Sequence, residues 1–533
     1  MIGQKGQIPI LVLKEGTERE RGKTAQINNI AAAKAVADAI KSTLGPKCLD
    51  KMLVDSMGDI LTTNDGAGIL KKMDVEHPSA KMLVEVAKAQ DTECGDGTTT
   101  AVVLAGELLK KAEQLIDQKI HPTIITNGYR LACAKANEAL EKISKKIDIN
   151  DRETLRKIGM TCMGSKAPRA LPHLVEIVVS AIEKVKEEKE GKTIVPRGNI
   201  HIVKKHGAST EDVELVDGMV MTNEPVCSDM PRVVKNAKIA LLSSALQIKK
   251  TEVDAKIKIK SPEQIKKFLD EEERVLIEKV KKVKDLGVNV LFCGKEIADL
   301  VGYELSKEGI YAVKQVADKD MEKLAKATGG RIVGNVNELE ENDLGKADIV
   351  ENKKIVGTNM TIVSGCKSAK AVTIFVRGGT EHAVDAVERI IEKGIKALSA
   401  AIEDGKIVVG GGAAPMEIAT DLKKYATTIS GREQLAIESF SSAIEVIPRT
   451  LAENGGLNSV DILIKLRKEH KDGNKGAGID LDTGNIVKLD DKIIEPTKIL
   501  RQAINTATEA STMILRIDDI ISAHRPKKEK EKG

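Results

Sequence analysis

The stretch Gly95-Asp96-Gly97-Thr98-Thr99-Thr100 opens an apolar run that begins at Ala101. Its two glycines allow a tight turn and a close backbone approach to a ligand, while its threonines offer hydroxyl groups and a helix N-cap. The N-terminus of the following helix favours an anion, so the pattern predicts a phosphate-binding loop. Asp96 fits such a loop if a divalent cation such as Mg²⁺ lies between carboxylate and phosphate. The alternative is an ordinary turn followed by a threonine-capped helix.

Length and composition narrow the class of protein. A chain of 533 residues is too long for a single core and predicts about three domains. Lys and Arg total 84 against 80 Asp and Glu, and this near balance gives no sign of a nucleic-acid binder. Aromatic residues make up only 2% of the chain, so the cores must be built from aliphatic side chains.

The cysteines and the apolar runs bear on the compartment. The seven cysteines form no C-x-x-C pair and lie near no histidine at zinc-ligand spacing, which predicts a reduced, intracellular setting. The first residues do not resemble a signal peptide, and no apolar run approaches the roughly 18 residues that a membrane span needs. We therefore expect a cytoplasmic protein without a membrane partner.

Two further polar turns precede the phosphate loop. Helical spacing over residues 25–42 ends at Thr43-Leu44-Gly45-Pro46-Lys47, which is either a simple helix stop or a second phosphate turn. Two short predicted strands, 50–54 and 59–62, then deliver Asp65 into a tight turn, and a helix from 77 to about 89 leads to Gly95. Three polar turns between residues 43 and 100 favour one shared site.

The middle of the chain has a different character. Residues 160–166 end in Lys166 on a small-residue loop, and the charged run 186–192 is expected to be a solvated connection. From about 215 to 368, short apolar runs alternate with helices, as in an α/β layer domain. Within it, residues 247–282 resemble an insertion whose helix carries an apolar face, either packed on its own domain or free to meet a partner as a mobile arm.

The last third begins with a predicted strand, 372–379, and a long helix, 380–404. The helix leads to residues 406–413, whose triple glycine Gly410-Gly411-Gly412 allows another close backbone approach. The charged tail 525–533 has no apolar content and is expected to be disordered.

In this order and spacing, the motifs resemble the chaperonins of the archaeal and eukaryotic cytosolic type (group II), the thermosome and its relatives. The resemblance covers essentially the whole chain. The residues that carry it are Thr43–Lys47, Asn64-Asp65-Gly66, Met73–Pro78, Gly95–Thr100, Arg377-Gly378-Gly379, Gly410–Ala413 and Arg516–Asp519.

The resemblance implies a multidomain fold. A mostly α-helical equatorial ATP-binding domain would comprise 1–146 and 408–533, and a small α/β intermediate hinge would comprise 147–214 and 369–407. An α/β apical domain, 215–368, would carry a helical lid protrusion at about 247–282. The implied activity is ATP-driven folding of unfolded polypeptides inside two stacked rings of identical or paralogous subunits.

The resemblance also assigns site residues. Asp96 would hold Mg²⁺, Asp65 would orient the attacking water, and Lys166 would sense the terminal phosphate. Glu495 would meet the ribose. The full implied ATP site comprises Thr43, Leu44, Gly45, Pro46, Lys47, Gly95, Asp96, Gly97, Thr98, Thr99, Thr100, Lys166, Gly411, Gly412, Asp480 and Glu495.

The sequence departs from the family pattern at the third site carboxylate. Counting from Glu388-Arg389 places Lys393 where the family has aspartate, so the alternative to an ATP-hydrolysing subunit is one that binds ATP but is impaired in hydrolysis and acts in mixed rings or as a holding cage. The alternative is that Lys393 points to solvent while Glu392 or a shifted helix supplies the acid. Cys48, Pro415 and Lys488 are lesser departures. Two other classes of protein are alternatives. A metal-dependent phosphotransferase would use similar loops, but the sequence shows no His or Cys constellation to supply its catalytic base. A passive scaffold would not explain so many nucleotide-site residues.

Overall fold

The computed structural model describes residues 17–54, 57–58, 60–164, 170–247, 262–366, 370–490 and 492–523. Lys166, most of the predicted arm before residue 262, and the tail 525–533 lie outside these residues. The chain divides into two compact units, one made from Met1–Asp148 with Asp404–Gly533 and the other from Ile149–Glu403. The described chain is mostly helical, with several small sheets.

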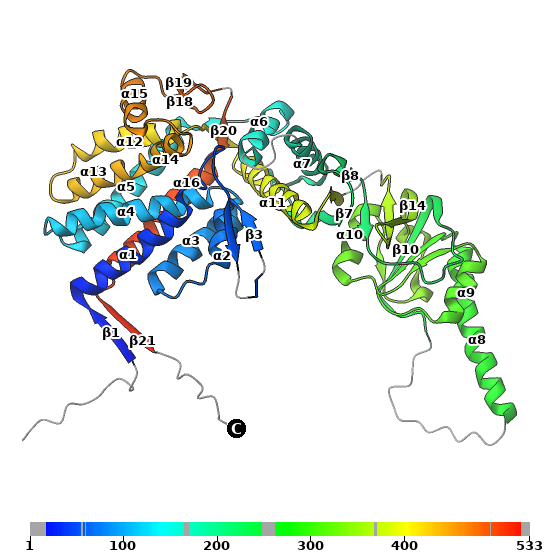
Figure 1. Ribbon diagram of the computed structural model, residues 1–533. Coiled ribbons are helices and arrows are strands. Elements are labelled where there is room, and N and C mark those ends of the chain that lie inside the picture. The colour runs from blue at the N-terminus through cyan, green and yellow to red at the C-terminus, as the bar shows by residue number, and fades with distance from the viewer. Residues whose placement is uncertain are drawn as a thin grey trace, which may run out of the picture. The chain divides into compact units, whose positions relative to one another are not determined.

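The first unit is a bundle of helices drawn from both ends of the chain (Figure 1). Its helices are α1 (Gly22–Lys41), α2 (Gly66–Lys72), α3 (Pro78–Cys94), α4 (Thr98–Asp117), α5 (Pro122–Ile143), α12 (Ala413–Ala426), α13 (Glu433–Ile444), α14 (Val446–Asn454), α15 (Ser459–Lys471) and α16 (Thr497–Leu515).

Short strands lie around this bundle. β17 (Lys406–Val409) is the central strand of a three-stranded sheet, and it places Val408 opposite Glu495. The remaining strands are its neighbours β4 (Lys145–Lys146) and β20 (Ile494–Pro496), and the antiparallel pairs β1 (Thr17–Arg21) with β21 (Asp519–Ala523), β2 (Lys51–Val54) with β3 (Ile60–Thr63), and β18 (Ala477–Asp480) with β19 (Asn485–Lys488).

Helix α4 forms the centre of the bundle. The five consecutive residues 101–105 are all buried, which occurs only where neighbours cover a helix on every side. A Cβ atom at Gly106 would overlap the Cβ atom of Ala37, so this glycine allows α1 and α4 to approach closely. The run that follows the phosphate loop therefore anchors that loop in the core.

The second unit is built around a mixed sheet with strand order β12-β11-β10-β14-β15-β9, to which β13 adds beside β10. Its strands are β9 (Met219–Met221), β10 (Val233–Leu242), β11 (Val290–Cys293), β12 (Tyr311–Val313), β13 (Ile332–Val333), β14 (Gly345–Ile355) and β15 (Thr358–Ser364). A smaller sheet has the order β7 (Ile200–His206), β16 (Val372–Gly378) and β8 (Glu214–Val216). The helices are α6 (Arg152–Met163), α7 (Leu171–Val185), α8 (Pro262–Asp285), α9 (Asp299–Lys307), α10 (Asp318–Thr328) and α11 (Glu381–Asp404).

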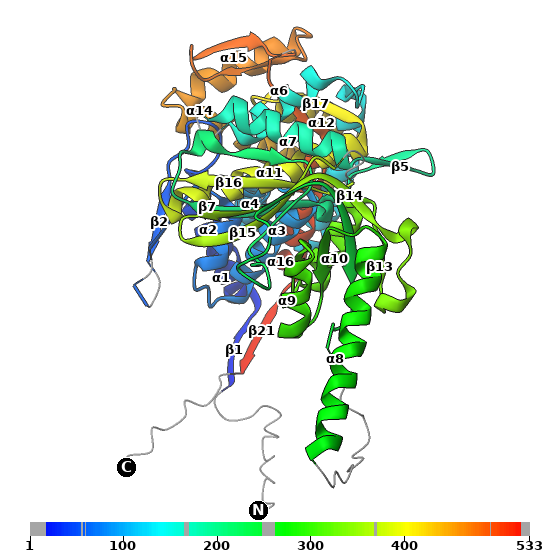
Figure 2. The same ribbon diagram turned by 90° about the vertical axis from the view of Figure 1, so that its right-hand side faces the viewer.

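Helix α8 corresponds to the predicted helix of the insertion. Its C-terminal half buries Leu276, Val280 and Val283 in the core of the large sheet, whereas residues 270–275 are exposed. Figures 1 and 2 show this N-terminal half extending beyond the sheet layer. The C-terminal half is therefore packed on its own domain, and the mobile arm stays a prediction.

Two local expectations were wrong. The charged run 186–192 was expected to be a connection, but it lies mostly in the hairpin of β5 (Glu187–Lys189) and β6 (Lys192–Ile194). The helix expected to end near residue 89 continues to Cys94, because Gln90 is buried and joins its apolar face. Among the described helices, none combines the length and apolarity needed to cross a bilayer.

Candidate nucleotide site

The loop between α3 and α4 has the geometry that its glycines predict. Helix α3 is capped by Gly95 at φ 72°, and Gly97 at φ 77° is the N-cap of α4. Both angles lie in the left-handed region, where a side chain costs about 1 kcal/mol or more. Thr98 and Thr99 are buried in the first turn of α4. The first N–H groups of a helix have no partner within the helix, so those of this turn are suited to phosphate oxygens.

The three predicted turns meet at this loop. Thr43 Oγ1 lies 3.2 Å from Thr99 Oγ1, and both hydroxyl groups are buried. A Cβ atom at Gly66 would lie 2.5 Å from Thr99 Oγ1, so the turn that carries Asp65 also packs against the start of α4. The simple helix-stop reading of Thr43–Lys47 does not account for this arrangement, because a helix stop has no need to contact the loop at residue 99.

Asp65 is fixed at the N-terminus of α2. Its Oδ2 atom accepts a hydrogen bond from the Gly68 backbone N–H at 2.9 Å, and its own N–H donates to Thr63 Oγ1 at 3.1 Å. The side chain is buried, with only 9% of its surface exposed. An N-cap aspartate of this kind has a preset orientation, which suits a group that must position a small polar ligand such as water.

The triple glycine brings the last part of the chain to the site. The Gly410 N–H donates to Ile493 O at 3.0 Å, and a Cβ atom at Gly410 would lie 2.6 Å from Glu495 Oε1. Glu495 is partly buried. Its pKa is raised from 4.5 to about 7, because burial disfavours the charged carboxylate and Asp96 adds a nearby negative charge. The structure therefore places Glu495 and Asp96 in one electrostatic neighbourhood.

Asp480 acts locally in the β18–β19 turn. Its Oδ1 atom accepts hydrogen bonds from the N–H groups of Asp482 and Thr483 at 2.9 and 3.3 Å, and these bonds lower the pKa of the carboxyl group. Lys47 reaches the same turn, because its Nζ atom donates to Leu481 O at 2.6 Å. The contact ties the phosphate turn to the hairpin after the triple glycine.

Two buried or partly buried amides were missed by the sequence reasoning. Asn454 Nδ2 donates to Lys41 O at 3.1 Å and to Leu44 O at 2.8 Å, which holds the Thr43–Lys47 turn. Gln90 Nε2 donates to Asp96 O at 2.9 Å and to Ile499 O at 3.1 Å. All four acceptors are backbone carbonyls, so no pattern of residue types could have indicated these hydrogen bonds.

Across the described residues, no group of three or more His, Cys, Asp or Glu side chains could hold a metal ion. A lone carboxylate such as Asp96 still fits Mg²⁺, because this ion keeps several waters and is usually bound through one or two carboxylates and substrate phosphates.

The model of the TCP-1/cpn60 chaperonin family matches residues 36–525. This chain belongs to that family. It is 53% identical to the thermosome subunit of Methanopyrus kandleri over 96% of this chain and 95% of the relative. It is also 53% identical to thermosome subunit alpha of Thermoplasma acidophilum, over 98% and 95% of the two chains. Thermosome subunit beta of Archaeoglobus fulgidus is 52% identical over 98% and 97%. The resemblance to group II chaperonins is therefore confirmed.

The departures of this chaperonin chain have definite surroundings. Lys393 lies on α11 in the second unit and is only 7% exposed, whereas Glu392 is exposed. The alternative that Lys393 points to solvent is therefore wrong. Pro415 lies in the first turn of α12, where a missing N–H costs little. Cys48 Sγ accepts from Asn64 Nδ2 at 3.4 Å, and Lys488 Nζ pairs with Asp490 at 3.6 Å.

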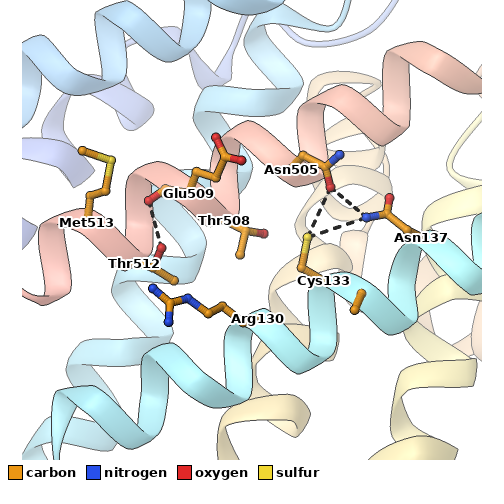
Figure 3. Close-up of a pocket in the computed structure, with 9 residues that line it drawn as sticks. Arg130, Cys133, Asn137, Asn505, Thr508, Glu509, Thr512 and Met513 are labelled. Atoms are coloured by element: carbon orange, nitrogen blue, oxygen red, sulfur yellow. Dashed lines mark hydrogen bonds between the residues drawn. The ribbon is translucent and has the colours of Figure 1, made fainter.

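A separate pocket of about 530 Å³ lies between α5 and α16 of the chaperonin chain (Figure 3). Cys133 lies on its α5 wall, and Asn505 Oδ1 accepts from Cys133 Sγ at 3.3 Å and from Asn137 Nδ2 at 2.8 Å. Burial raises the pKa of the Cys133 thiol, which keeps it protonated and weakly reactive. None of the predicted nucleotide residues lines this pocket.

Proposed function

We propose that this chain is a subunit of an ATP-dependent group II chaperonin and that its first unit binds the nucleotide. The observation that carries the proposal is the meeting of the Thr43–Lys47, Asp65 and Gly95–Thr100 turns at the first turn of α4 in a chain of this family. The backbone N–H groups of the Gly45 and Gly95 turns would bind phosphate oxygens. Asp96 would hold Mg²⁺ on those phosphates.

The remaining roles follow from position and chemistry. Asp65, oriented by Gly68 N–H and Thr63, would align the attacking water. Gly411 and Gly412 would lie against the nucleotide, and Glu495 would face the ribose, where a partly protonated carboxyl can both donate and accept. Phosphoryl transfer depends mainly on such positioning and on charge neutralisation. Lys166 stays a family-based prediction for sensing the terminal phosphate.

The assembly that we propose is a pair of stacked rings of identical or paralogous subunits that enclose unfolded polypeptide. The N-terminal half of α8, which is exposed at residues 270–275, would form part of a lid at about 247–282, closed by ATP-driven rotation of domains. Light scattering on the purified protein tests this assembly. A particle many times the 57.5 kDa chain mass supports rings, whereas a monomer or dimer supports a metal-dependent phosphotransferase that acts on a small molecule.

We propose a second candidate within the family, a subunit that binds ATP but hydrolyses it poorly. It is favoured by the buried lysine at position 393, because a charged lysine cannot accept a proton from water or bind Mg²⁺ as an aspartate does. The test is ATP turnover by the wild type beside Lys393→Asp. Restored hydrolysis in the variant, by about 100-fold or more, supports impaired hydrolysis in the wild type. Equal, chaperonin-like turnover in both excludes it.

A further inference from the structure

The end of α3 contacts the start of α16 through side chains that donate to backbone carbonyls. Gln90 donates to Ile499 O, and four residues later Cys94 Sγ donates to Lys498 O at 3.8 Å. Because residues i and i+4 lie on one helical face, both contacts come from the same side of α3. Gln90 additionally reaches forward to Asp96 O, so its amide joins the loop between α3 and α4 to α16.

The chemistry of the position requires an amide nitrogen. Both neighbours of Gln90 Nε2 are carbonyl oxygens, which only accept hydrogen bonds, so a side chain with two donor hydrogens satisfies both. The side chain is 0% exposed, and its Oε1 atom has no hydrogen-bond partner among the described residues. A buried acceptor left unsatisfied costs about 1–3 kcal/mol, which an apolar side chain of the same shape would avoid. An apolar side chain would, however, remove the donor from both carbonyl oxygens, so the two carbonyls that it joins account for a glutamine at this position.

The Gln90 amide, which we call the clamp because it joins Asp96 O and Ile499 O, lies beside the loop that carries the candidate metal ligand. A Cβ atom at Gly97 would lie 3.0 Å from Gln90 Nε2 and 2.7 Å from Ile499 Cγ2, so the loop is packed against both. Helix α16 begins immediately after β20, which carries Glu495. Because one amide binds both Asp96 O and Ile499 O, it fixes the distance between the loop of the candidate metal ligand Asp96 and the start of α16, which follows the proposed ribose ligand Glu495.

We propose that Gln90 is a positioning residue that holds Asp96 in register with the N-terminus of α16 for binding of Mg²⁺-nucleotide. This role rests on the proposed ATP site, because Gln90 acts only through Asp96. Residues that orient a metal ligand typically change metal affinity about 10- to 100-fold when they are removed. The clamp should consequently affect the part of ATP affinity that depends on Mg²⁺ and leave the metal-independent part unchanged.

The experiment is ATP binding by calorimetry to the full-length protein, with Mg²⁺ and with EDTA. The measured quantity is the ratio of the two dissociation constants. Gln90→Met should lower the Mg²⁺-dependent gain in affinity about 10-fold or more, as should Asp96→Asn. Gln90→Asn, which keeps the amide but shortens its reach, provides the same test if the Met variant does not fold.

A matched control is Asn29→Leu. Asn29 is a buried amide whose Oδ1 atom accepts from Ser79 Oγ, and it also carries an unsatisfied polar atom. Ser79 and Gln90 are 11 residues apart on α3, or about 16 Å along the helix axis. The control should keep the full Mg²⁺-dependent gain. An unchanged gain in Gln90→Met, or an equal loss in Asn29→Leu, overturns the role of Gln90 alone. If the wild type binds no ATP, the proposed function itself fails and the role of Gln90 fails with it.

Discussion

The two compact units differ in both construction and chemistry. The first packs helices from both chain ends around small aliphatic side chains, and it places polar turns at the helix ends where backbone N–H groups are unsatisfied. The second packs helices on a mixed sheet and contributes Lys393, the residue that departs most from the family pattern. The proposed phosphate turns and Asp65 thus belong to the first unit and Lys393 to the second, so a substitution in the second unit could alter the proposed hydrolysis while the phosphate turns stay unchanged.

The largest expected effect concerns the two cores. Phe440 in the first unit is fully buried and packs edge-to-face on Tyr129 with 5.5 Å between ring centroids. Phe292 is fully buried in the second unit. Replacing either with Ala should lower the free energy of unfolding of its own unit by about 3–5 kcal/mol through lost contacts and a residual cavity.

Hydrogen exchange, analysed separately for each unit, measures the loss of stability that each substitution causes. Phe440→Ala should weaken protection in α4, α5 and α13, and Phe292→Ala should weaken it in β10 and β11. The two units would have to be treated as one cooperative body if either substitution lowered protection in both to the same extent.

The next effect is a pH dependence that belongs to the first unit. The native pKa of Glu495 is about 7 against 4.5 for the free side chain, so the native state binds the extra proton and stability falls as pH rises between these values. The shift corresponds to at most about 3–4 kcal/mol, at about 1.36 kcal/mol per unit of pKa. Glu495→Gln should match the wild type near pH 4 and be more stable above pH 7.

Thermal unfolding from pH 4 to pH 8 without nucleotide checks this sign. Gln is neutral at every pH, so the difference between the two proteins should increase with pH and level off above 7. A difference that stays constant across the range would show that the Glu495 carboxyl group has the same pKa in the folded and unfolded states.

The third prediction concerns ATP turnover when Asp65 of the first unit and Lys393 of the second are substituted together. In the Lys393→Asp background, where turnover should be restored, Asp65→Asn should reduce it about 100-fold, because the amide keeps the shape of the N-cap but cannot act as a carboxylate toward water. In the wild-type background the same change should have little effect on turnover. Steady-state ATP hydrolysis by the four proteins gives the comparison. A 100-fold loss in both backgrounds would mean that the wild type already has a complete hydrolytic site.

The sequence predicted the turns of the site better than the supports behind them. Gly95, Gly97 and Asp65 were identified because glycine-containing polar turns have strong local signatures. Gln90 was not, since its partner Ile499 lies some 400 positions away along the chain.

The errors have similar physical causes. The β5–β6 hairpin was taken for a connection because its residues are mostly charged and exposed on both faces, which leaves no apolar alternation to detect. The sequence identified the unusual residue type at Lys393. Its burial could not be predicted, because it depends on tertiary packing that no local sequence pattern reveals. The division into three domains stays a prediction.

The smallest effect concerns an exposed ion cluster of the second unit. Lys204 Nζ lies 2.8 Å from both Asp385 Oδ1 and Glu388 Oε2, linking β7 to α11. The side chain of Lys204 is 49% exposed, so solvent screens both pairs and each should contribute less than about 1 kcal/mol. Lys204→Met should therefore lower the stability of this unit by about 1 kcal/mol or less, with no loss in 1 M salt, where the Debye length is about 3 Å.

Denaturant unfolding at low and high salt measures this loss of stability. The control is Lys189→Met, which removes the lysine of another exposed ion pair, with Glu187. A loss that persisted in high salt would mean that the lysine methylenes, rather than its charge, join the sheet to the helix.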